Sequence, residues 1–155
     1  MKVREIMTPN PLSCTVGTDL ATVARLMAKA HCGAVPVTDT GGTVTGIITD
    51  RDVCLAVAAE DRPARQILAG AAAARPVWTC GPDDEVATAL SRMKTCHVRR
   101  LPVVNPDRAL VGMLSWSDAA LGSGCTGERL EPALLVDAYM GIYEHRRVRT
   151  HALIG

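Results

Sequence analysis

Apolar residues recur along this chain with helical and strand periods in a fixed order. Between residues 19 and 31, apolar positions spaced i, i+3, i+4 and i+7 predict an amphipathic helix. Apolar runs over 34–37 and 44–48 predict two strands, and the polar and glycine residues 39–42 predict the turn between them. A second helix is expected over 50–59, directly after the second strand.

The same pattern returns 66 residues later. Residues 14–53 match 80–119 without a gap, and the matching landmarks include Cys14 with Cys80, Met27 with Met93, His31 with His97, Pro36 with Pro102, Gly46 with Gly112 and Asp52 with Asp118. A constant offset over so long a stretch indicates two copies of one supersecondary unit. Each copy is predicted to be β-α-β-β-α, with a short opening strand around 12–14 or 77–80. We therefore expect an α/β (α+β) fold of two repeats with pseudo-twofold symmetry.

The rest of the chain is assigned around these repeats. We expect the first repeat over 1–59, a linker over 60–75, the second repeat over 76–121 and a tail over 122–155. Residues 4–7 resemble residues 65–68 at an offset of 61, which predicts about five extra residues, an insertion in the Ala-rich linker, before the second opening strand. Apolar residues of the tail predict one helix with Pro132 in its first turn. A basic segment, 145–149, follows it and is expected to be a solvated helix end.

Composition excludes several classes of function. The formal net charge is +1, so the strong basic field of a non-specific nucleic-acid binder is missing. Aromatic residues make up 3% of the chain, which leaves few platforms for stacking single-stranded bases. No apolar stretch is long enough for a membrane span, and the first five residues lack the apolar run of a signal peptide. A cytoplasmic protein with no membrane and no nucleic-acid partner is predicted.

The six cysteines are expected to be reduced thiols, because the chain shows no secretion signal. Cysteine adjoins histidine at His31-Cys32 and at Cys96-His97, which occupy corresponding places in the two copies. No Cys-x-x-Cys pair accompanies them. A structural role is favoured, and a Cys/His metal or redox sensor is the alternative.

The sharpest local signal lies where the last strand of each copy meets its helix. Residues 46–52 and 112–118 both consist of Gly, two apolar residues, a hydroxyl residue, two variable residues and Asp. The hydroxyl of Thr49 or Ser115 can donate to a phosphate near a helix start. The carboxylate of Asp52 or Asp118 can accept from both ribose hydroxyls, or it can simply stabilise the start of the helix.

These motifs resemble those of tandem cystathionine-β-synthase (CBS) domains, the paired regulatory modules also found in IMP dehydrogenases and AMP-sensing kinase subunits. Ile6-Met7-Thr8-Pro9 is similar to the start of a first CBS domain, and 34–37 and 99–103 are similar to the hairpin strand of the family. The resemblance covers about residues 3–121 and leaves the tail uncovered. It implies a pair of CBS repeats with two related ligand sites in the cleft between them.

Carried onto this sequence, the resemblance implies that each site combines the hydroxyl-x-x-Asp motif of one copy with the opening segment of the other. One site would use Asp118 for ribose, and Ser115, Ser117, Arg100 and Thr8 for phosphate. The other would use Thr49, Arg51 and Asp52, with Arg51 as a candidate phosphate partner. The second set departs from the family pattern, because Ala34 stands where the first set has Arg100 and an alanine, Ala69 or Ala74, stands for Thr8. We therefore expect the Asp118 site to bind phosphate better.

By resemblance, the chain is a regulatory module and not an enzyme. It is expected to bind AMP, ADP, ATP or S-adenosylmethionine as a regulatory ligand, to require no other cofactor, and to form a homodimer through its CBS helices. The sequence contains no nucleophile with an ordered base, no metal triad and no P-loop. One alternative is a ligand-independent scaffold whose tail helix recruits a regulated protein partner. A Cys/His metal or redox sensor ranks below it.

Overall fold

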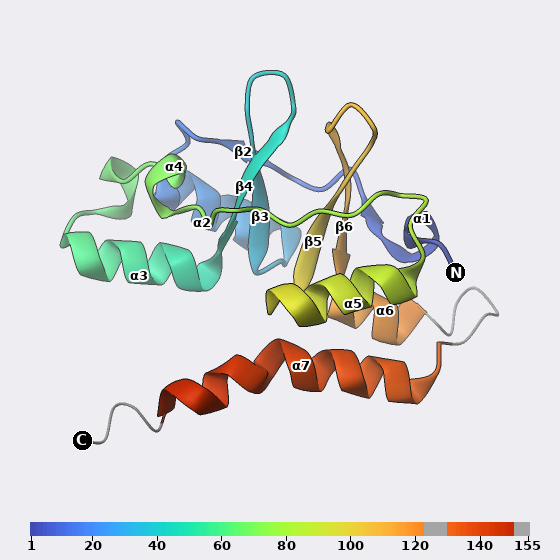
Figure 1. The fold of residues 1–155 in the computed structure, drawn as a ribbon. Helices are drawn as coiled ribbons and strands as arrows, with labels where there is room; N and C mark the ends of the chain where they lie inside the picture. Colours follow the sequence, from blue (N-terminus) through green and yellow to red (C-terminus); the bar gives the residue numbers. More distant parts are fainter. Residues whose placement is uncertain (123–129, 151–155) are drawn as a thin grey trace. The chain divides into compact units, whose positions relative to one another are not determined.

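The computed structural model describes residues 1–122 and 130–150, with side chains described as far as Glu144. The chain divides into two compact units (Figure 1). Unit 1 consists of residues 1–9, 78–103 and 112–155, and unit 2 consists of residues 10–77 and 104–111.

Unit 2 holds the body of the first repeat. Its three strands form a sheet in the order β2-β3-β4, with β2 parallel and β4 antiparallel to β3. The elements in chain order are β2 (Cys14–Thr15), α2 (Leu20–Ala30), β3 (Ala34–Thr38), β4 (Val44–Thr49), α3 (Asp50–Glu60), the 3-10 helix η1 (Ala64–Gln66) and α4 (Ala69–Ala72). A core of aliphatic side chains from α2, β3 and β4, together with Ile67 and Ala69, fills the space between helices and sheet.

Unit 1 holds the body of the second repeat. Its sheet has the order β1-β6-β5, and the hairpin tip between β5 and β6, residues 104–111, belongs to unit 2. The elements in chain order are α1 (Val3–Ile6), β1 (Thr8–Pro9), α5 (Val86–Cys96), β5 (Arg100–Val104), β6 (Leu110–Ser115), α6 (Trp116–Gly122) and α7 (Pro132–Thr150). Val3, Leu90, Met93, Leu101 and Leu114 are among its fully buried side chains.

The predicted mixed α+β class with two repeats is confirmed. The first repeat shows the order β-α-β-β-α, whereas the opening strand of the second is reduced to one bridge between Cys80 and Val103. Helix α2 begins after Asp19, whose carboxylate accepts a 2.9 Å hydrogen bond from the Thr22 N–H and so caps the helix. Helices α2 and α5 end in the same way, at His31 and His97, which adopt the left-handed conformation with φ of 48° and 53°. The two histidines therefore occupy equivalent positions at helix C-termini.

Each of the two matching apolar runs contains a proline, Pro36 or Pro102, and a proline within a strand predicts an edge or early-strand position. This is wrong for Pro36, which lies within the central strand β3 opposite Ile47 of β4. Strand β2 is only two residues long and pairs with Val37 and Thr38, so position 36 needs no N–H for a ladder bond on that side. Pro102 lies in β5, which stands at the end of its sheet order, as predicted.

The opening segments of the two repeats fold alike and lie 66 residues apart. The matching features are helix α1 with helix α4, the bridge Lys2–Glu85 with the bridge Leu68–Asp19, and the pairing Thr8–Met113 with the bridge Ala74–Ile47. The predicted offset of 61 for residues 65–68, with about five extra residues after them, is therefore wrong, because the offset of 66 already holds at Leu68 and continues to Ala74. A match of four residues was too short to define the register.

Each opening segment lies in the unit that contains the body of the other repeat. Residues 1–9 belong to unit 1, and the Ala-rich segment 67–74 belongs to unit 2. Gly112 of β6 lies against the Met7 side chain, and the equivalent Gly46 of β4 lies 3.2 Å from Ala73, measured from an ideal Cβ. A larger residue at either position would collide with the opening segment, so these two motif glycines have a packing role.

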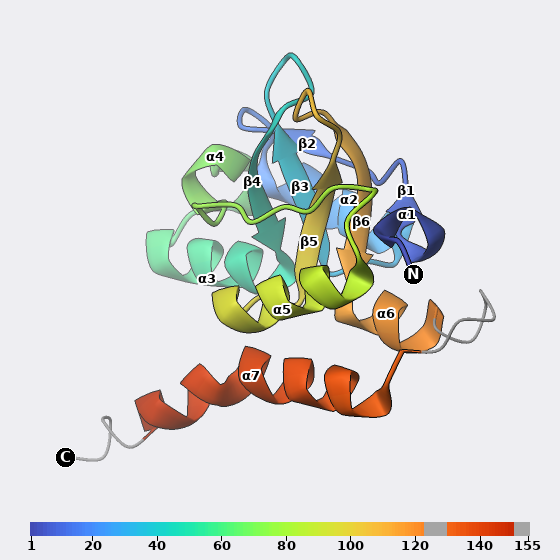
Figure 2. The same ribbon diagram turned by 45° about the vertical axis from the view of Figure 1, so that its right-hand side comes forward.

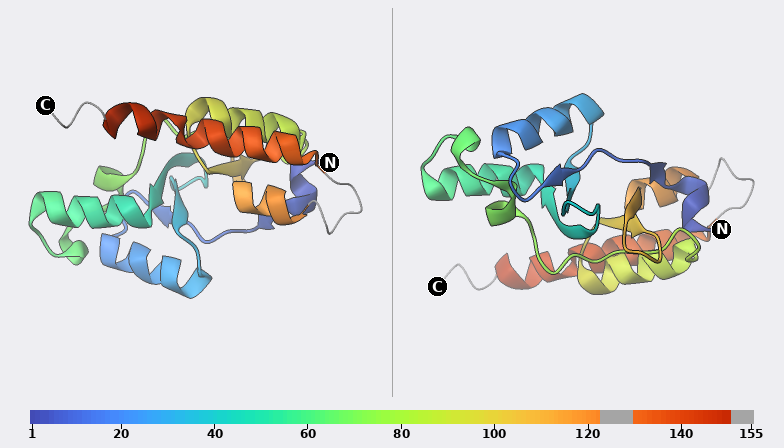
Figure 3. Two further views of the ribbon diagram at one scale, coloured as in Figure 1. Left: turned by 90° about the horizontal axis from the view of Figure 1, so that it is seen from below. Right: turned by 90° about the horizontal axis from the view of Figure 1, so that it is seen from above.

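The predicted tail helix is present as α7, with Pro132 as its first residue. Within unit 1, α7 runs beside α5 and α6 (Figures 2 and 3). Ala138 and Ile142 are each 2% exposed, so the apolar face of this helix is buried against the body of unit 1. The backbone of 145–149 continues the helix, and the side chains of that basic segment lie outside the described residues.

Two cysteines lie in the cores at equivalent positions. Cys14 and Cys80 are 5% and 2% exposed, and burial raises the pKa of the Cys14 thiol to about 11 and that of the Cys80 thiol to about 12. Cys54, on α3, is exposed. Cys125 lies outside the described residues.

We predict that Ile67→Ala lowers the free energy of unfolding by about 2–5 kcal/mol, because Ile67 is 1% exposed in the core of unit 2 and truncation leaves a cavity. The matched control is its neighbour Leu68, which is 50% exposed. Leu68→Ala should change stability by about 0.5 kcal/mol or less. Urea denaturation followed by circular dichroism measures both. Equal losses for the two variants would contradict the packing of 67–74 in unit 2.

The rate of thiol alkylation should distinguish the exposed cysteine from the two buried ones. At mildly alkaline pH, iodoacetamide should modify Cys54 well before Cys14 and Cys80, because the raised pKa of each core thiol keeps it protonated and burial blocks access to it. Mass spectrometry of tryptic peptides measures the order. In denaturant the difference should vanish, and rapid labelling of Cys80 in the native protein would refute its burial.

Candidate functional site

The hydroxyl-x-x-Asp motifs form the same hydrogen-bonded junction in both repeats. In unit 1, the Ser115 N–H donates to Oδ2 of Asp118 (2.7 Å), and the Asp118 N–H donates to Oγ of Ser115 (3.1 Å). In unit 2, the Thr49 N–H and hydroxyl both donate to Oδ2 of Asp52 (2.8 and 2.6 Å), and the Asp52 N–H donates to the Thr49 hydroxyl (3.2 Å). Each pair is a capping box that fixes the turn from strand to helix.

The aspartates thus have the helix-start role that was weighed against ribose binding. This role uses only one of the two oxygens of each carboxylate. All the capping bonds accepted by these two carboxylates go to Oδ2. The second oxygen of each carboxylate is held in a fixed place by the first, and it can accept hydrogen bonds from a ligand.

A cavity of about 190 Å³ lies beside the Ser115 junction in unit 1. Three predicted site residues line it together: Arg100 at the start of β5, Ser115 at the end of β6, and Ser117 in α6. The remaining lining residues are Arg99, Trp116, Tyr139, Ile142 and Tyr143. Two guanidinium groups and several hydroxyls therefore border one small space, an arrangement suited to an anion.

The other predicted residues of this site lie close by in the fold. Asp118 is joined to Ser115 by the capping box. Thr8 is exposed in β1 and pairs with Met113, two residues before Ser115 on β6. Unit 1 therefore brings the opening segment of the first repeat to the motif of the second, as expected for this set.

In unit 2, the predicted residues Thr49, Arg51 and Asp52 gather at the start of α3. Arg51 is exposed, and its backbone N–H donates to Asp50 (2.7 Å). The constant offset of 66 decides which alanine replaces Thr8 here: it is Ala74, which bridges to Ile47 of β4. Ala69 is instead fully buried in the core.

Sequence reasoning missed the part of the cavity wall that the tail supplies. Tyr139 and Tyr143 lie one turn apart on α7, with ring centroids 4.7 Å apart, and Trp116 lies 5.1 Å from Tyr139. The chain has only two Trp and two Tyr, so three of its four aromatic residues gather at this one place. The rarity of aromatics was the available signal, but the tail lies outside the repeat and had no second copy for comparison.

The residues of the Cys/His alternative are not arranged as a metal site. Within residues 1–122 and 130–144, no group of three or more His, Cys, Asp or Glu side chains could hold a metal ion. His97 instead contacts α7, with Nδ1 2.9 Å from the Gly141 carbonyl oxygen. None of the described helices is both long and apolar enough to cross a bilayer.

Comparison with known proteins gives matches over both repeats. The uncharacterized protein YlbB of Bacillus subtilis is 35% identical over 134 residues, which is 86% of this chain and 88% of that protein. A homoserine O-acetyltransferase of Methanohalophilus mahii is 30% identical over 115 residues. Those residues are 74% of this chain but only 23% of that enzyme.

Solved structures show the same fold. Hypoxic Response Protein I, with two coordinated zinc ions, has a TM-score of 0.71 at 25% identity, over 77% of this chain and 97% of that one. The protein PAE2072 from Pyrobaculum aerophilum, complexed with AMP, has a TM-score of 0.69 at 24% identity, over 90% of this chain and 99% of that one. The CBS domain pair of MJ0100, in complex with 5′-methylthioadenosine and S-adenosyl-L-methionine, has a TM-score of 0.70 at 24% identity, over 81% and 97%.

The model of the CBS domain family matches residues 3–59 and 69–121, whose starting points are again 66 residues apart. These two stretches contain both capping boxes, both opening segments and all eight predicted site residues. The chain therefore belongs to the CBS domain family and carries a pair of CBS domains.

Proposed function

We propose that this protein is a regulatory module that binds an adenine nucleotide or a related adenosyl ligand, and that it performs no catalysis of its own. The observation that carries the proposal is the cavity in unit 1, which brings together Arg100, Ser115 and Ser117. Binding of AMP, or of 5′-methylthioadenosine and S-adenosylmethionine, by CBS proteins of this fold supports the same ligand class.

Each residue has a role that follows from its chemistry. Arg100 pairs with a phosphate, for which its planar guanidinium offers two parallel N–H donors. The hydroxyls of Ser115 and Ser117 donate to the remaining phosphate oxygens. Asp118 accepts from the ribose hydroxyls through the oxygen that the capping box does not use. Thr8, on the neighbouring strand, adds a further hydroxyl.

The lining of the cavity favours a phosphorylated ligand over S-adenosylmethionine. Its two charged side chains are the arginines Arg99 and Arg100. A phosphate gains from both charges, whereas the sulfonium cation of S-adenosylmethionine is repelled by them. AMP, ADP and ATP are therefore the ligands we expect first.

The site in unit 2 is proposed to be weaker. Ala34 and Ala74 replace Arg100 and Thr8, so the site keeps the carboxylate for ribose but loses two phosphate contacts. Arg51 is the cation that remains at the start of α3. The two repeats thus share their ribose chemistry and differ in their phosphate chemistry.

A ligand-independent scaffold remains the second candidate function, and the nucleotide titrations below separate it from a sensor. Homodimerisation and a cytoplasmic location stay predictions. Helices α5 and α6 already contact α7 within unit 1. We therefore expect a dimer to use α2 and α3, where Leu55 is 51% exposed.

We predict that AMP, ADP or ATP raises the melting temperature. A ligand that binds the folded state at about 100 times its Kd stabilises the protein by about 2.7 kcal/mol. Arg100→Ala should weaken this effect by about ten-fold in Kd or more, since hydrogen bonds to charged groups contribute about 1.5–3 kcal/mol. Differential scanning fluorimetry and calorimetric titration measure both effects.

The control for charge is Arg65→Ala, which removes an exposed arginine on η1 in the other unit and should leave binding unchanged. Adenosine and S-adenosylmethionine test the ligand preference and should bind less tightly than AMP. If none of the three nucleotides shifts the melting temperature of the native protein, the sensor function is wrong and the scaffold function is favoured.

A second prediction compares the two aspartates. Asp118→Asn and Asp52→Asn disturb equivalent capping boxes, so both should lower the stability of the ligand-free protein by a similar amount, about 1 kcal/mol. Only Asp118→Asn should abolish the tighter nucleotide-binding event in calorimetry. Equal effects of the two variants on that event would contradict the predicted inequality of the sites.

A further inference from the structure

The tail helix α7 is held by the same two short segments that form the phosphate side of the cavity. Arg99 donates a 3.1 Å hydrogen bond to the Tyr143 hydroxyl, and its chain neighbour Arg100 lines the cavity. The Trp116 indole N–H donates to the Leu135 carbonyl oxygen of α7 (3.1 Å). Trp116 stands between Ser115 and Ser117, the two predicted phosphate donors.

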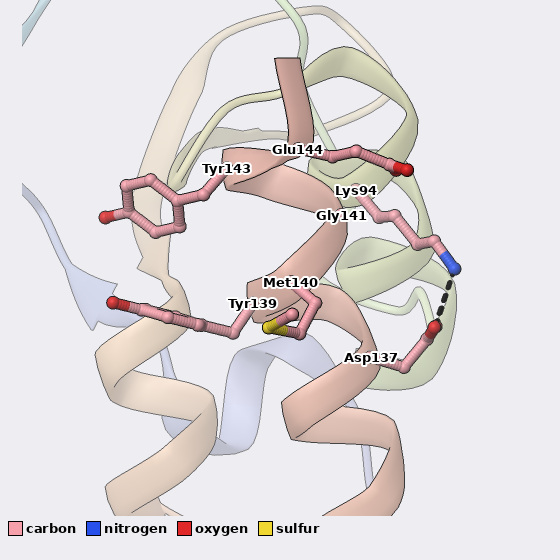
Figure 4. Close-up of a pocket in the computed structure, with 7 residues that line it drawn as sticks. All are labelled: Lys94, Asp137, Tyr139, Met140, Gly141, Tyr143 and Glu144. Atoms are coloured by element: carbon pink, nitrogen blue, oxygen red, sulfur yellow. Dashed lines mark hydrogen bonds and ion pairs between the residues drawn. The ribbon is translucent and has the colours of Figure 1, made fainter. Parts of the chain in front are cut away.

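The helix also forms a wall of the cavity itself. Tyr139, Ile142 and Tyr143 line it, and they face the segments 99–100 and 115–117. Figure 4, a close-up of a different pocket that shares Tyr139 and Tyr143 with this cavity, shows the two tyrosine side chains one turn apart on one side of α7. The Lys94–Asp137 ion pair lies on the opposite side of the helix, with N···O distances of 2.8 Å.

The residues that hold α7 are peculiar to the second repeat. At the constant offset of 66, Trp116 corresponds to Asp50, Arg99 to Gly33 and Lys94 to Ala28. The first repeat therefore lacks the indole, the guanidinium and the ammonium group that contact α7 in unit 1. Docking of the helix and the richer set of phosphate donors occur in the same repeat.

We propose that α7 is part of the ligand site of unit 1, and that its docking and the binding of a phosphorylated ligand in this cavity strengthen each other. This inference rests on the proposed nucleotide-binding function. Because Arg99 and Trp116 each adjoin phosphate-binding residues, a ligand that fixes segments 99–100 and 115–117 also fixes the surface on which α7 docks. By linkage, the docked helix raises ligand affinity by the same factor.

The geometry of the docked helix indicates that the coupling between docking and ligand binding is favourable. With α7 in place, the cavity is already formed. The Tyr143 hydroxyl accepts a hydrogen bond from Arg99, and the Arg99 Cζ lies 6.0 Å from the centroid of the Tyr143 ring. The aromatic wall excludes water from one side of the cavity, which strengthens the attraction between arginine and phosphate. Without the wall, the same charges would face solvent, where ion pairs contribute little.

The direct test loosens α7 without removing a cavity residue. An ideal Cβ on Gly141 would overlap the Lys94 side chain, so Gly141→Leu should separate α7 from α5. We expect the Kd for AMP, measured by calorimetry, to rise at least about five-fold, the lower end of typical allosteric couplings. Val136→Ala, at a position on the same helix that is 61% exposed, is the matched control and should bind as the native chain does.

A milder variant covers the case in which Gly141→Leu fails to fold. Tyr143→Phe keeps the ring and removes only the hydroxyl that accepts from Arg99. Its Kd for AMP should rise in the same direction by a smaller factor. An unchanged or lower Kd in every folded variant that loosens α7 overturns the inference and leaves the nucleotide-binding function intact.

A second readout follows the helix itself. In a Trp78→Phe background, Trp116 is the sole tryptophan, and its ring contacts Tyr139 of α7. AMP should change Trp116 fluorescence and slow amide hydrogen exchange over residues 132–144. Binding without slower exchange would overturn the coupling. If the native chain binds none of AMP, ADP and ATP, the proposed function and this inference both fail, a result distinct from binding that ignores α7.

Discussion

The exchange of hydrogen bonds between a hydroxyl residue and the aspartate three positions later holds the point where strand becomes helix in both repeats. Ser115 with Asp118, and Thr49 with Asp52, satisfy backbone N–H groups that the end of a strand and the start of a helix would otherwise leave unpaired. The direction of α6 and α3 depends on these junctions, and so does the position of every side chain proposed to contact a ligand.

One consequence is that a single aspartate serves two purposes without conflict. The Oδ2 oxygen of Asp118 is committed to the backbone, and this commitment orients the other oxygen. A carboxylate held in this way loses little side-chain entropy when a ligand arrives, so more of the interaction energy appears as affinity. The helix-start role and the ligand role support each other, although sequence reasoning weighed them as alternatives.

Much of the fold followed from apolar periodicity, because the repeat provided each pattern twice. Helix α2 and the paired strands β3 and β4 were predicted within a residue or two. The register of the opening segment was missed, since the segment 69–74 is almost all alanine and offers no pattern to align. Its position became evident only from pairings such as Ala74 with Ile47 and Thr8 with Met113. Local sequence cannot predict a contact between segments that lie so far apart in the chain.

The tail shows a second limit of prediction from the sequence. Its helix was predicted, but the surface that receives it was not, because docking depends on side chains scattered over three elements. Burial of Ala138 and Ile142 supplies the main driving force, at roughly 25 cal/mol per Å² of apolar surface removed from water. The exposed Lys94–Asp137 pair adds little, since solvent screens it. The helix docks on the second repeat and not on the first because Trp116 and Arg99, which bind it, have no counterparts in the first repeat.

The exchange of opening segments also means that the two repeats cannot be separated by one cut. A fragment ending at residue 59 would lack Ile67 and Ala69, which complete the core of unit 2, while the remaining fragment would lack Val3, which is fully buried in unit 1. Each half of the duplicated sequence therefore supplies a structural part of the other half. One repeat alone would therefore leave part of its core unfilled, and two copies that exchange opening segments are needed to complete both cores.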